Sequence, residues 1–157
     1  MAAIDVRALP PRRGPRPDTT RPTRERAMPH QQVSQNAPES MQEELFRRAA
    51  ALDGVVVADS LVSVPGARAF HLAEGVETGP PEAFQRGREF AHLHPPIDGS
   101  LHMTLPPDVF QDVQSKGWGE PHPISGTMMV FGPRDEDELG VVWAILKTSY
   151  GYARAKA

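Results

Sequence analysis

Cysteine is absent from the 157 residues, which excludes disulfide bonds, thiolate metal ligands and cysteine nucleophiles. Apolar runs are far shorter than the ~20 residues that a membrane span needs. The arginines near the N-terminus are not followed by the apolar segment of a secretory signal. The nucleophile-elbow, Walker, dinucleotide-binding and zinc-protease motifs are missing as well. These absences predict a soluble cytoplasmic protein with no membrane partner.

Charge and proline content divide the chain into two parts. Residues 1–40 carry a net charge of +3 and the remainder a net charge of −6. A folded part this acidic is a poor surface for nucleic acid, so no nucleic-acid partner is expected. Residues 1–39 hold seven of the 17 prolines and show little hydrophobic periodicity. This composition predicts a disordered, Pro/Arg-rich tail before a folded domain of residues 40–157. Whether the arginines of the tail meet an anionic partner or only solvent stays open.

The folded part opens with a predicted helix. Ser40 and Glu43 match the S-x-x-E capping box, and apolar residues then recur at helical spacing up to Gly54. Runs typical of strands follow at 55–64, 67–73, 89–94, 100–105 and 127–131, with a short helix after the fourth run and a long helix at 134–153. The order α-β-β-β-β-α-β-α predicts an α+β fold, with a small antiparallel sheet of about five strands and helices packed on one face.

A hairpin of residues 89–94 and 100–105 is predicted to gather histidines on one face of this sheet. Side chains alternate along a strand, and a five-residue loop at 95–99 places His92 opposite His102. The first face then carries Phe90, His92, His94, Ser100, His102 and Thr104, and the second carries Glu89, Ala91, Leu93, Leu101, Met103 and Leu105. Directly opposed residues have Cβ atoms about 4.5–5.5 Å apart, close enough for imidazoles to share an ion.

Imidazole is both a common metal ligand and a group that exchanges protons near neutral pH. An H-x-H pair with a third histidine on the next strand suits a three-nitrogen site with open positions for water or substrate. Glu120 lies in a proline-bounded loop and is a candidate fourth ligand or general base. The candidate catalytic residues are His94, His102, Glu120 and His122, the candidate metal ligands are His92, His94, His102 and His122, and the candidate substrate-binding residues are Ser100, Trp118 and Arg134. Neither the presence of a divalent metal nor any other cofactor follows from the sequence.

A purely structural interpretation accounts for the same residues. Histidines on a solvent-facing sheet surface bind nothing, Trp118 belongs to the core, and Arg134 pairs with Glu138. His71 stands alone between apolar neighbours and is left out of the site. The distances among His94, His102, Glu120 and His122 decide between the two interpretations.

Three stretches, EFAHLHPPIDGSLHMTLP, GWGEPHP and FGPRDEDELGVVWAILKTSYGYA, resemble the bacterial and fungal luciferase-domain family. The resemblance covers about residues 89–152, and the matching positions are His94, Ser100, His102, Trp118, Glu120, His122, Pro133, Arg134 and Glu138. The resemblance supports the site more than any one activity, and two interpretations remain. In the first, the protein is a small enzyme that transforms an organic metabolite by imidazole and Glu120 chemistry with or without a metal, while Arg134 orients an anionic group. The alternative is a non-catalytic binding or accessory module. The chain lacks a flavin motif and is too short for the barrel of the bacterial flavin luciferases.

Overall fold

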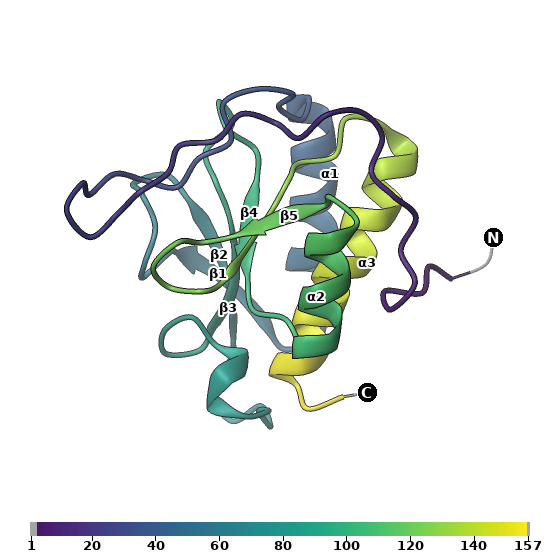
Figure 1. Cartoon of the computed structure of the whole chain (residues 1–157). Helices are drawn as coiled ribbons and strands as arrows, with labels where there is room; N and C mark the ends of the chain where they lie inside the picture. Colours follow the sequence, from purple (N-terminus) through teal and green to yellow (C-terminus); the bar gives the residue numbers. More distant parts are fainter. Residues whose placement is uncertain (1–2, 157) are drawn as a thin grey trace.

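A single antiparallel sheet organises the molecule, and a computed structural model describes it for residues 3–156 (Figure 1). Its six strands lie in the spatial order β1-β2-β3-β4-β6-β5. Their bounds are Val55–Asp59 (β1), Arg68–Leu72 (β2), Glu89–Leu93 (β3), Leu101–Met103 (β4), Gly119–Pro121 (β5) and Met128–Val130 (β6). The sixth strand is β5, which pairs with β6 at the edge of the sheet and lies in the stretch predicted as a loop. Pro121 fits there because an edge strand has no second partner that needs its N–H.

Helices cover one face of the sheet, as the sequence predicts. The helices are α1 (Glu39–Ala50), α2 (Pro107–Ser115) and α3 (Glu136–Ala153), with one 3₁₀ turn, η1, at Pro81–Ala83. α1 and α3 lie against each other and against the sheet, whereas α2 packs beside β5 (Figure 1). The α+β class and the order of elements are therefore confirmed. Within residues 3–156, none of the helices has both the length and the apolar character needed to cross a bilayer.

The two long helices begin differently. Asp135 caps α3, because its side chain accepts a hydrogen bond from the backbone N–H of Glu138 at 2.9 Å. α1 begins at Glu39 after Pro38, and no side chain caps it. The predicted capping box is therefore wrong. Glu43 instead forms an ion pair with Arg68 at 2.7 Å, so that its carboxylate joins α1 to the sheet.

A β-bulge in β3 changes which residues face the helices. Phe70 pairs with Ala91 and His71 pairs with Glu89, so Phe90 has no residue opposite it on β2. The Phe90 ring lies 6.5 Å from that of Phe70 and 6.0 Å from that of Tyr150, inside the core. The prediction that Phe90 shares a face with the histidines is therefore wrong. For the same reason Glu89 lies on the same side of the sheet as the histidines, although alternation along the strand places it on the opposite side.

The N-terminal segment, residues 3–38, has a defined course over the domain. It contains no helix or strand and only one isolated β-bridge, between Thr19 and Gln32. Leu9 is 1% exposed within the apolar core, and the Trp118 indole N–H donates to the Pro10 carbonyl at 2.7 Å. The chain then crosses the face of the sheet opposite α1 and α3 (Figure 1, dark purple). This differs from the disordered tail that composition predicts, because a few buried anchors hold the segment.

Candidate functional site

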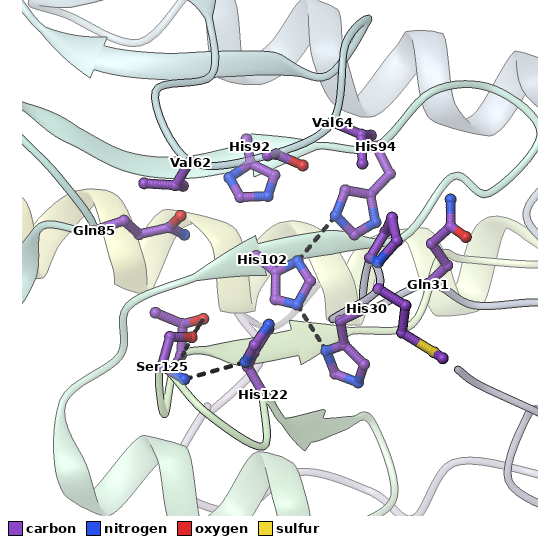
Figure 2. Close-up of a pocket in the computed structure, with 14 residues that line it drawn as sticks. His30, Gln31, Val62, Val64, Gln85, His92, His94, His102, His122 and Ser125 are labelled. Carbon is purple, nitrogen blue, oxygen red and sulfur yellow. Dashed lines mark hydrogen bonds between the residues drawn. The ribbon is translucent and has the colours of Figure 1, made fainter. Parts of the chain in front are cut away.

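Five histidines from separate parts of the chain line one cavity of about 460 Å³ (Figure 2). They form the histidine cluster: His30 of the N-terminal segment, His92 and His94 at the end of β3, His102 of β4 and His122 after β5. Their ring centroids lie 4.7–5.6 Å apart in contacting pairs. His92 lies directly opposite His102, as the hairpin register predicts. The imidazoles of the two adjacent strands and that of His122 therefore lie at one cavity, as predicted.

The rest of the cavity wall comes from loops. The lining residues outside the histidine cluster are Met28, Pro29, Gln31, Val62, Ser63, Val64, Gln85, Ser125 and Thr127. The volume lies within the range of small-molecule sites. Among the described lining residues there is no carboxylate, so the polar part of the wall is made of imidazole, amide and hydroxyl groups.

A continuous chain of hydrogen bonds runs through three of the histidines. His94 Nε2 lies 2.9 Å from His102 Nδ1, and His102 Nε2 lies 2.9 Å from His30 Nδ1 (Figure 2). The chain ends at a carboxylate on both sides. His94 Nδ1 lies 2.9 Å from Asp98 Oδ2, and His30 Nε2 lies 3.0 Å from Glu120 Oε2. Both carboxylates are buried, at 2% and 5% exposure.

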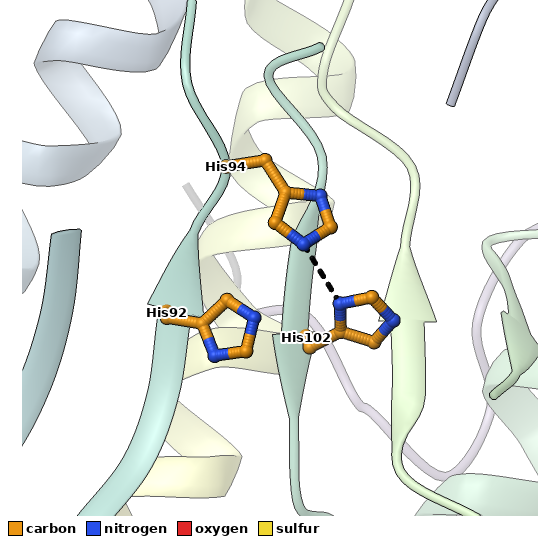
Figure 3. A group of neighbouring side chains, drawn as sticks. All are labelled: His92, His94 and His102. Carbon is orange, nitrogen blue, oxygen red and sulfur yellow. Dashed lines mark hydrogen bonds between the residues drawn. The ribbon is translucent and has the colours of Figure 1, made fainter. Parts of the chain in front are cut away.

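His92 stands beside this chain with a carboxylate of its own. Its Nδ1 lies 2.8 Å from Glu89 Oε2, and its Nε2 is buried without a hydrogen-bond partner in residues 3–156. Glu89 is held in turn by the Ser60 hydroxyl and the Leu61 amide, at 2.8 and 2.7 Å. The rings of His92, His94 and His102 face one another (Figure 3). One nitrogen from each lies within 4.8 Å of the other two.

His122 carries its ring proton on Nε2, whereas His92 carries it on Nδ1, beside the Glu89 carboxylate. His122 Nδ1 accepts hydrogen bonds from the backbone N–H groups of Ile124 and Ser125, both at 3.1 Å. The lone pair of the neutral ring is therefore on Nδ1 and the proton on Nε2. His122 thus offers the cavity an N–H donor and no free lone pair.

Burial and hydrogen bonding set the charges of these groups. Burial alone raises the pKa of Glu89, Asp98 and Glu120, but hydrogen bonds from their histidine partners and from neighbouring hydroxyl groups outweigh it, so all three are lowered. The carboxylates are therefore ionised at neutral pH. Burial lowers the pKa of His92, His102 and His122, and the neighbouring imidazoles lower that of His102 further. These three rings are therefore neutral at neutral pH.

The structure does not bring the predicted substrate-binding residues to the cavity wall. The Ser100 hydroxyl donates to Asp98 and lies 3.0 Å from His94 Nδ1, fully buried behind the ring. Trp118 lies in the core with its N–H on Pro10. The Arg134 guanidinium donates to the Glu138 carboxylate, to the Gln35 side chain and to the Arg13 carbonyl. Glu120 also lies behind the wall, where Thr19 donates to its second oxygen at 2.9 Å.

His30 is the member of the cluster that the sequence analysis missed. Its side chain is fully buried and joins His102 to Glu120 in the hydrogen-bond chain. It lies in a proline-rich stretch without periodicity, so no local pattern marks it. Only its contacts with residues 72 and 90 positions further along the chain show its place. His71 lies outside the cavity, with Nε2 near the Asp59 carbonyl, as expected.

The fold and the site thus define an α+β domain with a buried histidine cluster at the wall of a cavity. Residues 87–149 match the family model described as the luciferase domain. Luciferases of Armillaria ostoyae and Armillaria gallica are each 32% identical to the chain over 161 residues, covering 92% of the chain and 60% of the relative. A luciferase of Neonothopanus nambi is 36% identical over 74 residues, or 41% of the chain and 28% of that protein.

Residues 87–149 thus match the luciferase domain and the chain is similar to these fungal proteins, which confirms the predicted resemblance. It spans 60% of the length of the Armillaria relatives. The residues that match the family model include every member of the histidine cluster except His30. No solved structure matches the chain.

Proposed function

We propose that this protein is an enzyme that binds a small organic molecule in the cavity and transfers a proton to or from it through the histidine cluster. The observation that carries the proposal is the unbroken hydrogen-bond chain from Asp98 to Glu120, which passes through His94, His102 and His30 at the cavity wall. Burying polar side chains costs free energy unless they are hydrogen-bonded, and apolar side chains fill a core at lower cost. A chain of paired imidazoles that opens into a cavity therefore supports a chemical role.

The residues have different parts in this proposal. His122 presents an N–H to the cavity, which donates to an oxygen of the bound molecule. The chain of His94, His102 and His30 takes up and returns the proton, because three neutral rings bring three protons to its four contacts and one contact can accept another. Glu120 acts one step away from the molecule, by holding His30. It is a positioning residue here, and His122 is the residue in contact with substrate.

Binding is tested by ligand-observed NMR with a set of hydroxylated aromatic acids and aliphatic hydroxy acids. We expect His122→Ala to weaken the binding of the hits about fivefold, because one neutral hydrogen bond is worth about 1 kcal/mol. His71→Ala is the matched control, since His71 lies outside the cavity. Binders should shift the ring resonances of His122 and His30 and leave those of His71 in place. A screen without binders, or binders insensitive to His122→Ala, would count against the cavity as the site.

Turnover separates the enzyme from the alternative, a non-catalytic binding module. The names of the fungal relatives suggest a light-emitting reaction, and their identity extends over 92% of the chain. The protein is therefore mixed with an extract of Armillaria mellea mycelium, and both light and the consumption of extract components are measured. We expect consumption that His102→Ala abolishes and His71→Ala preserves. Binding in the NMR experiment without consumption of any component supports the binding module.

A further inference from the structure

We propose that His92, His94 and His102 bind one divalent transition-metal ion, such as Zn²⁺, at the wall of the cavity. The ligand atoms are Nε2 of His92, Nε2 of His94 and Nδ1 of His102 (Figure 3). The proposal concerns metal binding alone and holds whether or not the cavity takes an organic molecule. Two independent features of the buried side chains carry it.

The first feature is the unpartnered nitrogen of His92. The side chain is 4% exposed, and its Nδ1 lies 2.8 Å from the Glu89 carboxylate. A carboxylate accepts only, so Nδ1 holds the ring proton and Nε2 holds the lone pair. This lone pair has no donor within residues 3–156. It faces the rings of His94 and His102, where a cation would meet it (Figure 3).

The second feature is the number of protons in the hydrogen-bond chain. Asp98 to His94, His94 to His102, His102 to His30 and His30 to Glu120 are four bonds, and each needs one proton. Three neutral imidazoles supply three protons, because the carboxylates at both ends are acceptors. With protons alone, the chain must therefore hold one extra proton in a buried site.

A divalent ion between His94 and His102 removes this requirement. His94 then donates from Nδ1 to Asp98, and His102 donates from Nε2 to His30, which donates to Glu120. Every ring is neutral with one proton, and every N–H has an acceptor. Each ligand then has a hydrogen-bond partner on its far nitrogen, as metal-binding histidines do in general. The ion also offsets the charge of three buried carboxylates, Glu89, Asp98 and Glu120.

The distances suit such an ion. His94 Nε2 and His102 Nδ1 lie 2.9 Å apart. A tetrahedral ion about 2.1 Å from two nitrogens holds them about 3.4 Å apart, so the two rings need to part by only about 0.5 Å to admit it. Neutral imidazole nitrogens favour zinc, copper, iron and nickel over magnesium or calcium. All three ligands line the cavity, so the remaining coordination position opens toward it.

His122 is excluded from the ligand set, which differs from the four-histidine set predicted from the sequence. Its lone pair is taken by the amides of Ile124 and Ser125. The ion therefore leaves the His122 N–H free to donate to a bound molecule. It takes the place of the proton between His94 and His102, so the proton transfer proposed above belongs to the metal-free form.

Calorimetric titration of tag-free, chelator-treated protein with ZnCl₂ tests the proposal. We expect one Zn²⁺ per chain, with affinity at least about 100-fold weaker in His92→Ala, His94→Ala and His102→Ala. Glu89→Gln should weaken it about 10-fold or more, since Gln accepts more weakly from His92. His71→Ala and His122→Ala should leave the affinity unchanged. No saturable site at one ion per chain, or an equal loss in His122→Ala, would overturn the proposal.

Circular dichroism shows which variants are folded. If the alanine variants are not, the visible spectrum of the wild-type protein with Co²⁺ decides. Intense absorption of a four- or five-coordinate nitrogen-ligated ion supports the site, whereas the weak spectrum of the hydrated ion contradicts it. The titration needs no organic molecule, so its failure and that of the proposed enzyme are distinguishable.

Discussion

Glu138, in the first turn of α3, is an ionised residue with only 2% of its side chain exposed. It accepts hydrogen bonds from the backbone N–H and the Nε–H of Arg134, both at 2.9 Å. Burial alone raises the pKa of Glu138, but these bonds and the Arg134 charge outweigh burial and lower it. Its position at the helix N-terminus adds to the preference for a negative charge. Glu138 therefore joins the loop before α3 to the helix itself.

Glu138→Gln should reduce the free energy of unfolding by about 2 kcal/mol at neutral pH, because hydrogen bonds to a charged group are lost. The folded-state pKa lies below the unfolded value. The contribution is therefore full above the ordinary glutamate pKa of ~4.3 and is lost as the pH falls through the lower folded value. Urea unfolding at several pH values measures it. The difference from wild type should shrink in acid, whereas the exposed neighbour variant Glu136→Gln should differ little throughout. A gap that is constant with pH would contradict this account.

For single residues, the sequence predicts which side of the sheet a side chain occupies better than it predicts which residues that side chain contacts. The shared face of His92 and His94 follows from alternation, and the position of His92 opposite His102 follows from the five-residue loop between the strands. Arg134 pairs with Glu138, which the purely structural interpretation predicts from their spacing. The partnership of Glu89 with His92 could not be predicted, since it depends on the bulge at Phe90. Neither could the place of His30, which depends on contacts made across 72 residues.

Among the elements, the hairpin of β3 and β4 is predicted well because one register satisfies both faces. A slip by one residue would turn the buried Leu93 and Leu101 toward the histidines. The bulge at Phe90 could not be predicted from the register, because the position of the Phe90 ring depends on its contacts with Phe70 and Tyr150 in the core. β5 could not be predicted either. A three-residue edge strand that starts at a glycine carries too little periodicity to be distinguished from a loop.

Gly119 is required in β5 by the closeness of β6. A Cβ atom there would lie 2.4 Å from the Met129 carbonyl oxygen. Gly119→Ala should therefore cost about 1–3 kcal/mol of unfolding free energy, because the two strands must separate. Gly140→Ala is the matched control. Its Cβ would lie 3.5 Å from Ile4 Cδ1, and alanine in a helix gains about 0.5–1 kcal/mol. Thermal and urea unfolding of both variants measure the effects, and equal stabilities would disprove the close approach.

At the scale of the whole molecule, the N-terminal segment supplies Leu9 to the apolar core and residues 28–31 to the wall of the cavity. Composition predicts disorder there because prolines and arginines dominate residues 1–39. Composition cannot register single anchors such as the buried Leu9 or the His30 side chain. The sheet and the helices could therefore be predicted from the sequence, whereas one wall of the cavity could not.

Leu9→Ala distinguishes a docked segment from a tail. Leu9 is 1% exposed in the core, so its truncation should reduce the free energy of unfolding by about 2–4 kcal/mol. The control is Leu61→Ala, at a leucine that is 52% exposed, where a change within about 0.5 kcal/mol is expected. Chemical denaturation followed by tryptophan fluorescence measures both. If both variants match the wild type, Leu9 is not packed as described.

The position of His30 also bears on how this protein diverges and how it is engineered. A fragment cut to residues 87–149 would keep four histidines of the cluster and lose the fifth, together with the wall at residues 28–31. Grafting that fragment onto another scaffold would transfer strands β3 to β6 without the His30 side chain, which joins His102 to Glu120. Conversely, substitutions at residues 28–31, which lie outside the helices and strands, change the cavity wall directly. The shape of the cavity can therefore change through substitutions that do not alter residues of the apolar core.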